Sequence, residues 1–153
     1  MTRRKFAMLL TSAAVPAGVI AVRPWARAAA PISVTLYKSP SCTCCEGYAQ
    51  YLGQNGFTVE VRSTNDLSAI SRKAGIPENL QGCHTSFIGT YVVEGHVPVK
   101  TVRKLLDEQP AIVGVTLPGM PMGTPGMSGE KTGPLTVYAV SRDGTPPRSF
   151  DVF

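Results

Sequence analysis

The feature that most constrains the fold of this chain is a group of three cysteines placed between a strand pattern and a helix pattern. Residues 32–37 alternate apolar and polar side chains and are rich in β-branched residues, which predicts a strand. Residues 44–54 carry apolar side chains at helical spacing, which predicts a helix. Cys42, Cys44 and Cys45 fall where the strand gives way to the helix. Any fold for this chain must therefore place three thiols at one helix N-terminus.

The chain continues to alternate strand and helix patterns as far as residue 110. The predicted elements are a strand at residues 57–61, a helix at 67–74, strands at 86–88 and 91–93, and a helix at 99–108. The resulting order, β-α-β-α-β-β-α, predicts an α/β fold with a mixed sheet flanked by helices. This order is typical of a thioredoxin-like domain, which is the fold class that we predict.

A segment of different composition follows the last predicted helix. Residues 111–133 are rich in Gly, Pro and Met and show little periodicity, so we predict an irregular C-terminal extension there. One more strand is predicted at residues 135–140, followed by a turn and a short tail. We therefore divide the chain into an N-terminal segment (1–28), a thioredoxin-like domain (29–110) and a C-terminal extension (111–153).

The formal net charge of +5 comes entirely from the N-terminal segment. Residues 1–28 contain five basic residues and no acidic residue, and the rest of the chain has ten of each. A nucleic-acid-binding domain is expected to keep a basic face on its folded part, so the charge distribution argues against that class. It argues equally against a protein held at a membrane surface by a polybasic patch.

The same N-terminal segment has the features of an export signal. The basic residues 3–5 precede a moderately apolar stretch at 6–22, and residues 26–28 read Ala-Arg-Ala, a small-x-small cleavage pattern. Two of the three basic residues are adjacent arginines, which favours a signal of the twin-arginine type. An ordinary secretory signal and an uncleaved membrane anchor are the alternatives.

The spacing of the cysteines indicates chemistry at the start of the first helix. Cys42 and Cys45 form a Cys-x-x-Cys pair, which after a strand is typical of thioredoxin-like redox sites. The unpaired N–H groups of a first helical turn stabilise thiolates. Dithiol exchange, however, needs neither Cys44 nor the Cys83-His84 pair that precedes a later strand. Four thiols that converge on one helix terminus favour a metal site.

Two other interpretations of the cysteines stay open. In a dithiol redox site, Cys42 would attack and Cys45 would resolve. In an exported protein, four cysteines could also form structural disulfides. Bridges from Cys44 to either neighbour would be strained, so one Cys42–Cys45 bridge with two free thiols is the more reasonable disulfide arrangement.

The types of side chain favour copper(I) as the metal. Thiolates and thioethers are soft ligands that suit Cu(I), and Met120, Met122 and Met127 fall within eight residues of the extension. Each methionine could instead pack as a flexible hydrophobic side chain. Zinc could use the same cysteines, although structural zinc sites usually show two well-separated pairs. Of the two histidines, His84 is the stronger candidate ligand because it follows a cysteine, whereas His96 stands alone in a predicted turn.

Four short motifs occur together in the chain. They are residues 37–45 (Tyr-Lys-Ser-Pro-Ser-Cys-Thr-Cys-Cys), 83–85 (Cys-His-Thr), 93–98 (Val-Glu-Gly-His-Val-Pro) and 118–121 (Pro-Gly-Met-Pro). Their combination resembles the CopG-type periplasmic copper-resistance proteins. The resemblance covers roughly residues 32–140, which is most of the chain beyond the predicted signal.

The resemblance implies a thioredoxin-like domain whose C-terminal extension helps to bind metal beside the cysteine motif. It implies a multinuclear, thiolate-bridged copper cluster with sulfur ligands from Cys42, Cys44, Cys45 and Cys83. It also implies further ligands among His84, His96, Met120, Met122 and Met127. The role proposed for such proteins is copper detoxification by interconverting Cu(I) and Cu(II) before efflux.

The leading hypothesis is a periplasmic copper-binding protein of copper resistance. Its expected partners are copper ions and a copper efflux system or other periplasmic copper proteins, without nucleic acid, and we expect a monomer. Whether the protein is an enzyme, as a copper oxidoreductase would be, is left open by the sequence. A thiol–disulfide oxidoreductase that uses Cys42 and Cys45 is the first alternative, and a copper chaperone without redox turnover is the second.

Overall fold

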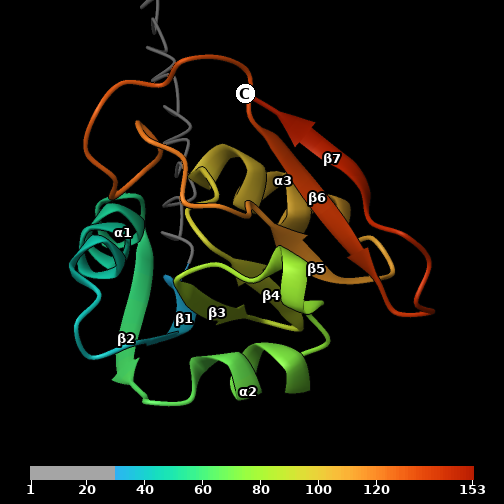
Figure 1. Cartoon of the computed structure of the whole chain (residues 1–153), viewed down its shortest axis with the longest axis horizontal. Helices are drawn as coiled ribbons and strands as arrows, with labels where there is room; N and C mark the ends of the chain where they lie inside the picture. The colour runs from blue at the N-terminus through green and yellow to red at the C-terminus, as the bar shows by residue number, and fades with distance from the viewer. Residues whose placement is uncertain (1–29) are drawn as a thin grey trace, which may run out of the picture.

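A seven-stranded mixed sheet organises residues 30–153, the part of the chain that this computed structural model describes (Figure 1). The strands are β1 (Ile32–Lys38), β2 (Phe57–Ser63), β3 (His84–Ile88), β4 (Tyr91–Glu94), β5 (Ile112–Thr116), β6 (Thr136–Ser141) and β7 (Arg148–Val152). They lie in the order β2-β1-β3-β4-β5-β6-β7. The pairs β1–β2 and β4–β5 are parallel and the other four are antiparallel. The export signal predicted at residues 1–28 lies outside the described residues and stays a prediction.

Within residues 30–110, three α-helices and one short turn of 3₁₀-helix connect the strands. They are α1 (Thr43–Gln54), α2 (Leu67–Lys73), the 3₁₀ turn η1 (Glu78–Leu80) and α3 (Val99–Glu108). All three α-helices lie where the sequence predicts them, because each carries a local signal. The start of α2, for example, is fixed by Asp66, whose carboxylate accepts a hydrogen bond from the N–H of Ala69 (3.1 Å).

Helices α1 and α3 cover one face of the sheet, and α2 lies on the other face (Figure 1). The main core forms between the sheet and the two longer helices, with Leu52 of α1 and Leu105 of α3 fully buried. A smaller cluster, formed by Ile76, Leu80 and Val92 with Val140, packs on the opposite face. The sheet thus has two covered faces, which is the architecture expected of a mixed α/β protein.

Two strands depart from the prediction. Residues 112–116 were expected to be irregular but form β5, which pairs with β4 and β6 inside the sheet. Its sequence, Ile-Val-Gly-Val-Thr, is a short run without alternation and is interrupted by a glycine, so a test of periodicity misses it. Residues 148–152 were expected to be a tail but form the edge strand β7, whose polar side chains give little burial signal. The segment after residue 110 therefore adds three strands to the same sheet.

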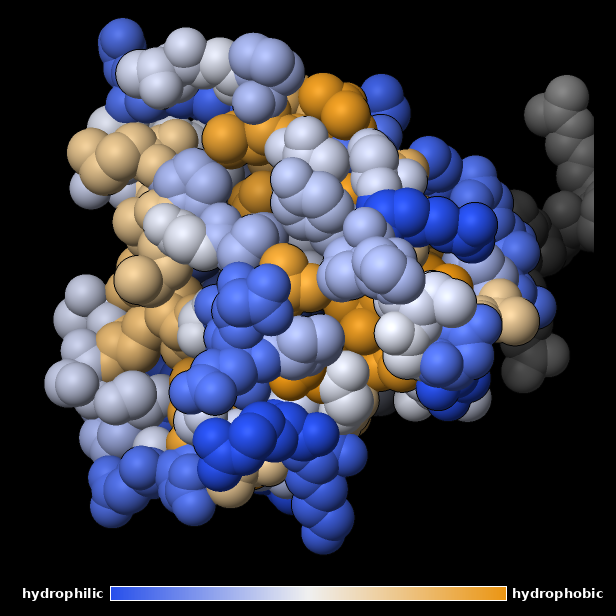
Figure 2. Space-filling view, turned by 45° about the vertical axis from the view of Figure 1, so that its right-hand side comes forward, coloured by the Kyte–Doolittle hydropathy of each residue, from blue (hydrophilic) through white to orange (hydrophobic). Residues whose placement is uncertain are grey.

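The surface carries few large apolar side chains. On the face drawn in Figure 2, hydrophobic surface shows as patches between hydrophilic side chains. Among the described residues, the exposed large hydrophobics are Val61, Met120, Met122 and Val152. None of the helices in residues 30–153 is long and apolar enough to cross a membrane.

The junction of β4 and β5 generates a test of the fold. Gly114 lies opposite Val92, and a Cβ added at Gly114 would overlap with the carbonyl oxygen of Val92. We expect Gly114→Ala to lower the free energy of unfolding by at least about 2 kcal/mol, because the strands cannot separate without losing their hydrogen bonds. Chemical denaturation followed by far-UV circular dichroism measures this change.

The matched control is Gly53→Ala in α1. Gly53 is exposed, and an added Cβ there would meet no atom within 4 Å. This substitution should raise the stability by about 0.5–1 kcal/mol, since alanine restricts the unfolded chain and favours a helix. Equal effects of the two substitutions would contradict the tight β4–β5 packing.

Candidate metal centre

The pairing of β1 with β3 brings the cysteine loop and Cys83 to the same edge of the sheet. The two strands are antiparallel, and Lys38 at the end of β1 lies opposite His84 at the start of β3. The chain that leaves β1 therefore passes the chain that enters β3. Cys42, Cys44 and Cys45 follow β1 closely and Cys83 directly precedes β3, so all four cysteines are brought together.

The sulfur atoms of these four cysteines lie within 4.8 Å of one another. Cys42 and Cys45 are joined by a disulfide, whereas Cys44 and Cys83 are free. The Cys44 sulfur lies 3.5 Å from that of Cys42 and 3.8 Å from that of Cys83. The Cys45 sulfur is 3.2 Å from the carbonyl oxygen of Cys83, so the loop and the start of β3 are in contact.

The N-terminus of α1 adds a positive electrostatic environment to the sulfurs. Cys42 is the N-cap residue, and no side chain caps the helix by a hydrogen bond. The free N–H groups of the first turn then carry the positive end of the helix dipole, which stabilises thiolates in this position. The geometry expected from a Cys-x-x-Cys pair at a helix start is present.

Lys38 lies beneath the cysteine loop and holds its backbone. Its side chain is only 3% exposed, and its ammonium group donates to the carbonyl oxygens of Ser39 (3.2 Å), Pro40 (3.3 Å) and Cys42 (3.2 Å). The ammonium also pairs with the carboxylate of Glu46 (3.2 Å), a largely exposed residue of the first turn of α1. A buried charge needs partners of this kind, and here they belong to the loop and helix that carry three of the cysteines.

Two histidines extend the cysteine cluster on the side of Cys83. The donor atoms of Cys83, His84 and His96 all lie within 4.8 Å of one another. The Cys83 sulfur is 3.1 Å from Nε2 of His96 and 3.4 Å from Nδ1 of His84. Both rings are fully buried and pack edge to face, with centroids 4.8 Å apart. The sequence ranked His96 as the weaker candidate, but the structure places it at least as close to the sulfur.

The orientation of His96 depends on α1 and on the C-terminal segment. Nδ1 of His96 lies 2.7 Å from the carbonyl oxygen of Pro125. A carbonyl can only accept, so Nδ1 carries the proton and donates, and Nε2 presents its lone pair to Cys83. On the other side, the hydroxyl of Tyr48 donates to the carbonyl of Val97 (2.7 Å), and its ring packs against both imidazoles.

Glu94 positions the backbone that carries Cys83. Its buried carboxylate accepts hydrogen bonds from the N–H of Gly82 (2.8 Å) and from the hydroxyl of Ser71 (3.4 Å). Burial raises the pKa of Glu94 to about 7. A Cβ on Gly82 would lie 2.9 Å from Cα of Gly95, so these two segments are packed backbone against backbone. Cys83 and His96, which directly follow these two glycines, are therefore held at a fixed separation.

Burial keeps Cys83, His84 and His96 in their neutral forms in the metal-free protein. Burial, followed by the neighbouring Cys44, raises the pKa of the Cys83 thiol to about 12. Burial likewise lowers the pKa of His84 to about 3, with a smaller effect from His96, and lowers the pKa of His96. Neutral imidazoles are ready to bind a metal, whereas the Cys83 thiol has to release its proton on binding.

The three methionines differ in their exposure to solvent. Met120 and Met122 are exposed, at 45% and 56%, and Met127 is partly buried. All three lie in the loop that joins β5 to β6, which also supplies Pro125. Their role as ligands stays a prediction.

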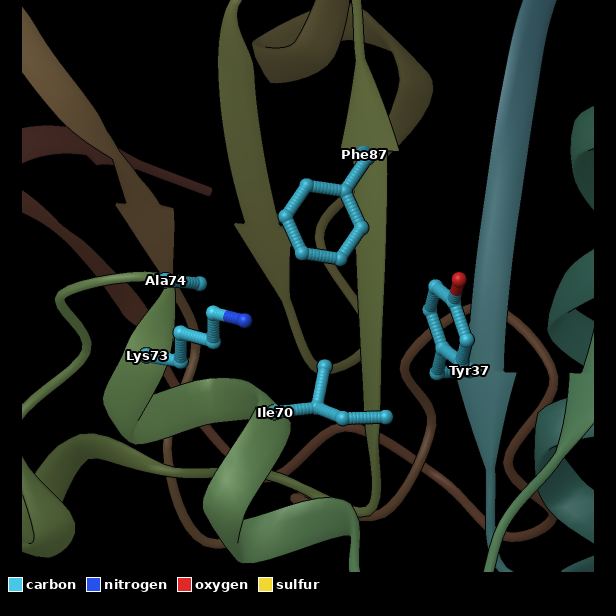
Figure 3. A pocket seen from close by; sticks show the side chains of 5 residues that line it. All are labelled: Tyr37, Ile70, Lys73, Ala74 and Phe87. Atoms are coloured by element: carbon cyan, nitrogen blue, oxygen red, sulfur yellow. The ribbon is translucent and has the colours of Figure 1, made fainter.

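A hollow in the described surface is separate from the metal centre. A cavity of about 400 Å³ lies between α2 and strands β1 and β3. Figure 3 shows Ile70 and Lys73 reaching into it from α2, and Tyr37 and Phe87 from the two strands. No cysteine or histidine lines this cavity, and the cysteines of the metal centre are themselves partly exposed except for Cys45.

Residues that act through their backbone are the ones that the sequence does not reveal. Pro125 supplies a carbonyl to His96. Gly126 packs closely against α1: a Cβ added there would be 2.5 Å from the backbone N of Tyr48 and 2.9 Å from the carbonyl oxygen of Cys44. Neither contact leaves a signal in the residue type. Tyr48 could be recognised as a buried position of the helix but not as a neighbour of the histidines.

The comparisons with known proteins agree with this geometry. Residues 80–127 match a family described as "Protein of unknown function, DUF411". A search among curated proteins finds no match. Two solved structures, forms 1 and 2 of a "Copper resistance protein copG", are each 33% identical to this chain. Each superposes with a TM-score of 0.74 and covers 80% of this chain and 98% of its own.

The fold and the site define a mixed α/β protein with a cluster of cysteines and histidines that could hold metal ions. The identity and coverage of the two structures place it more closely. The chain belongs to the family of the CopG copper-resistance proteins, as the motifs of its sequence predicted.

The burial of the two histidines generates a test by titration. In the metal-free protein we expect the ring of His84 to remain neutral at about pH 5, where an exposed histidine is mostly protonated, and the ring of His96 to gain its proton at a lower pH than an exposed histidine does. Nitrogen-15 NMR of the ring nitrogens measures this directly. A ring of His84 that gains its proton near pH 6.5 would contradict the buried site.

The lowered pKa of His84 also makes the stability of the fold depend on pH. Between the folded and unfolded pKa values of His84, the unfolded chain binds more protons, so acidification from about pH 6.5 toward 3 destabilises the fold by up to about 1.4 kcal/mol per pH unit. The raised pKa of Glu94 acts in the opposite sense, because there the folded chain binds more protons between about pH 4.5 and 7. The ring signals therefore test His84 more cleanly than global stability does.

Proposed function

We propose that this protein binds copper in copper resistance and holds Cu(I) in a multinuclear site bridged by the thiolates of Cys42, Cys44, Cys45 and Cys83. The observation that carries the proposal is the convergence of four sulfurs, from two segments 38 residues apart, at one helix N-terminus. The two similar solved structures are of copper-resistance proteins. Copper is the cargo of such a site rather than a resident cofactor.

The chemistry of the donors fits Cu(I). Thiolates are soft ligands, and three of them in four residues can bridge neighbouring ions more readily than they can surround a single zinc ion. Several thiolates accumulate negative charge in a partly buried place. The free N–H groups of α1 and the ammonium of Lys38, which lies against the carbonyl of Cys42, offset this charge.

Loading of the full thiolate site requires reduction of the Cys42–Cys45 disulfide. An external dithiol would supply two electrons and two protons, releasing two thiols and forming its own disulfide. Each thiol then gives up its proton when it binds copper. Cys44 and Cys83 are already free and need no reduction.

We infer a thioredoxin-like domain at residues 29–110, and an extension at 111–153 that closes the site through Pro125 and supplies ligands from Met120, Met122 and Met127. The protein would be exported by a twin-arginine signal at residues 1–28 and act in the periplasm as a monomer. It would interconvert Cu(I) and Cu(II) and pass copper to an efflux system or another periplasmic copper protein.

A thiol–disulfide oxidoreductase is the second candidate, and the Cys42–Cys45 disulfide favours it. In that case Cys42 would attack a substrate disulfide, and Cys45 would displace the substrate thiol from the mixed disulfide. The products are a reduced substrate and the Cys42–Cys45 bridge. This function uses neither Cys44 nor the two histidines.

Substitution of Cys44 separates the two candidates. We expect Cys44→Ser to lose most of the copper bound by the reduced protein, because this sulfur lies between those of Cys42 and Cys83. Copper content is measured by elemental analysis after anaerobic loading with Cu(I) and removal of free metal. Disulfide reductase activity on insulin is measured in parallel.

Thr43→Ser is the matched control, since it changes the exposed residue next to Cys44 and removes no sulfur. It should keep the copper content of the unmodified protein. Full copper content in Cys44→Ser would sink the thiolate cluster, and undiminished reductase activity in that variant would favour the second candidate.

A further inference from the structure

We propose that the hollow between α2 and strands β1 and β3 binds a small aromatic carboxylate. This α2 hollow has a volume of about 400 Å³ and is lined by Tyr37, Ile70, Lys73, Ala74 and Phe87. It shares no residue with the cluster of cysteines and histidines, so the inference does not depend on copper binding. It also lies on the face of the sheet that α2 covers, opposite the face covered by α1 and α3 (Figure 1).

The walls of the α2 hollow are apolar side chains that remain half-buried. Ile70 and Ala74 come from α2 and its C-cap, and Tyr37 and Phe87 come from the two strands (Figure 3). Ala74 and Phe87 also pack against the smaller core cluster, so the hollow continues that core toward the surface. An apolar group placed there would remove the walls from water, which is the main driving force for binding in such a site.

The two rings in the walls favour an aromatic ligand. Tyr37 and Phe87 pack edge to face, with centroids 5.8 Å apart and planes at 89°. A further ring can stack on the face of one while it meets the edge of the other, and both arrangements are favourable for aromatic pairs. The hydroxyl of Tyr37 accepts a hydrogen bond from Arg62 (3.0 Å), which restrains its ring before a ligand binds.

Lys73 gives the α2 hollow a positive charge that no acidic residue in its lining offsets. Its side chain reaches into the hollow from the end of α2 (Figure 3). The two ion pairs among residues 30–153 are made by Lys38 and Arg62, so Lys73 has no carboxylate partner there. The last carbonyls of α2, which would repel an anion, accept hydrogen bonds from the N–H groups of residues 74–76. An ammonium group beside an apolar hollow is complementary to a carboxylate that carries an apolar group.

The surroundings of the α2 hollow favour a small molecule over a protein partner. A stable protein interface buries about 800 Å² of each partner around an apolar centre. The large hydrophobic side chains exposed within residues 30–153 are Val61, Met120, Met122 and Val152, and none of them lines the hollow. Its volume, by contrast, falls within the range of about 300–1,000 Å³ that is typical of small-molecule sites. The ligand is therefore an aromatic carboxylate with one or two rings.

The test uses 3-phenylpropionate, which joins one aromatic ring to one carboxylate. We expect it to bind the full-length, disulfide-bonded protein with a Kd of about 0.1–1 mM, which is ordinary for a ligand of this size. NMR of carbon-13-labelled aromatic and methyl groups should show saturable shifts at Tyr37, Phe87 and Ile70. The neutral 3-phenylpropionamide should bind about three- to tenfold more weakly, because it cannot pair with the ammonium group. Acetate, which has no ring, should give no saturable shift.

Lys73→Gln tests the charge in the α2 hollow. It should weaken binding of 3-phenylpropionate by about three- to tenfold and leave the affinity for the neutral amide unchanged. Lys100→Gln is the matched control, since Lys100 is an exposed lysine of α3, which covers the other face of the sheet. It should leave both affinities unchanged.

Ala74→Phe tests the α2 hollow itself by placing a ring of the protein inside it. Ala74 has φ of −76° and ψ of −4°, a conformation that phenylalanine adopts without strain. The variant should bind neither probe, and it should keep or gain thermal stability because the new ring joins the smaller core cluster. Circular dichroism checks its fold. If this variant does not fold, Lys73→Gln carries the test, because that position is exposed.

The outcomes are read at the α2 hollow and do not involve copper. Shifts that saturate, weaken in Lys73→Gln and disappear in Ala74→Phe support the inference. It is overturned by an absence of saturation up to about 5 mM, by binding that persists in folded Ala74→Phe, or by equal affinities for the acid and its amide. A protein that binds no copper would leave the inference standing, and a hollow that binds no carboxylate would leave the proposed function standing.

Discussion

The antiparallel pairing of β1 with β3 is the constraint on which the rest of the site depends. It sets Lys38 opposite His84, so the loop that leaves one strand and the segment that enters the other meet at one edge of the sheet. The cysteine motif is then close to Cys83, although 38 residues separate Cys45 from it. A slip of this register by one residue would turn the side chains of one strand to the wrong face and separate the candidate ligands.

The histidine side of the metal centre depends on close backbone contacts, which a residue larger than glycine would not permit. Gly82 packs on Gly95, and a Cβ on Gly95 would lie 2.6 Å from the carbonyl of Leu117. Gly126 rests on the first turns of α1, which places the carbonyl of Pro125 on His96. The loop between β5 and β6 thereby acts on the cluster through its backbone, whatever its methionines do.

The sequence was sufficient for the elements and the candidate ligands whose signals are local. Helix α3 follows from its apolar spacing, and the cysteines follow from their chemistry. Strand β5 could not be predicted, because Gly114 is required by a contact with Val92 that exists only after β4 and β5 have paired. For the same reason the roles of Pro125 and Glu94 were hidden: one acts by a carbonyl, and the other by a buried hydrogen bond to a distant backbone N–H.

In the proposed function, reduction of this protein creates a thiolate-bridged copper cluster. X-ray absorption spectroscopy at the copper edge, on reduced protein loaded with Cu(I), tests it most directly against a Cys42→Ser variant treated in the same way. The account predicts several equivalents of copper, a ligand shell dominated by sulfur and scattering between neighbouring copper ions, all diminished in Cys42→Ser. Protein that retains no copper, or holds a single ion without copper–copper scattering, would contradict it.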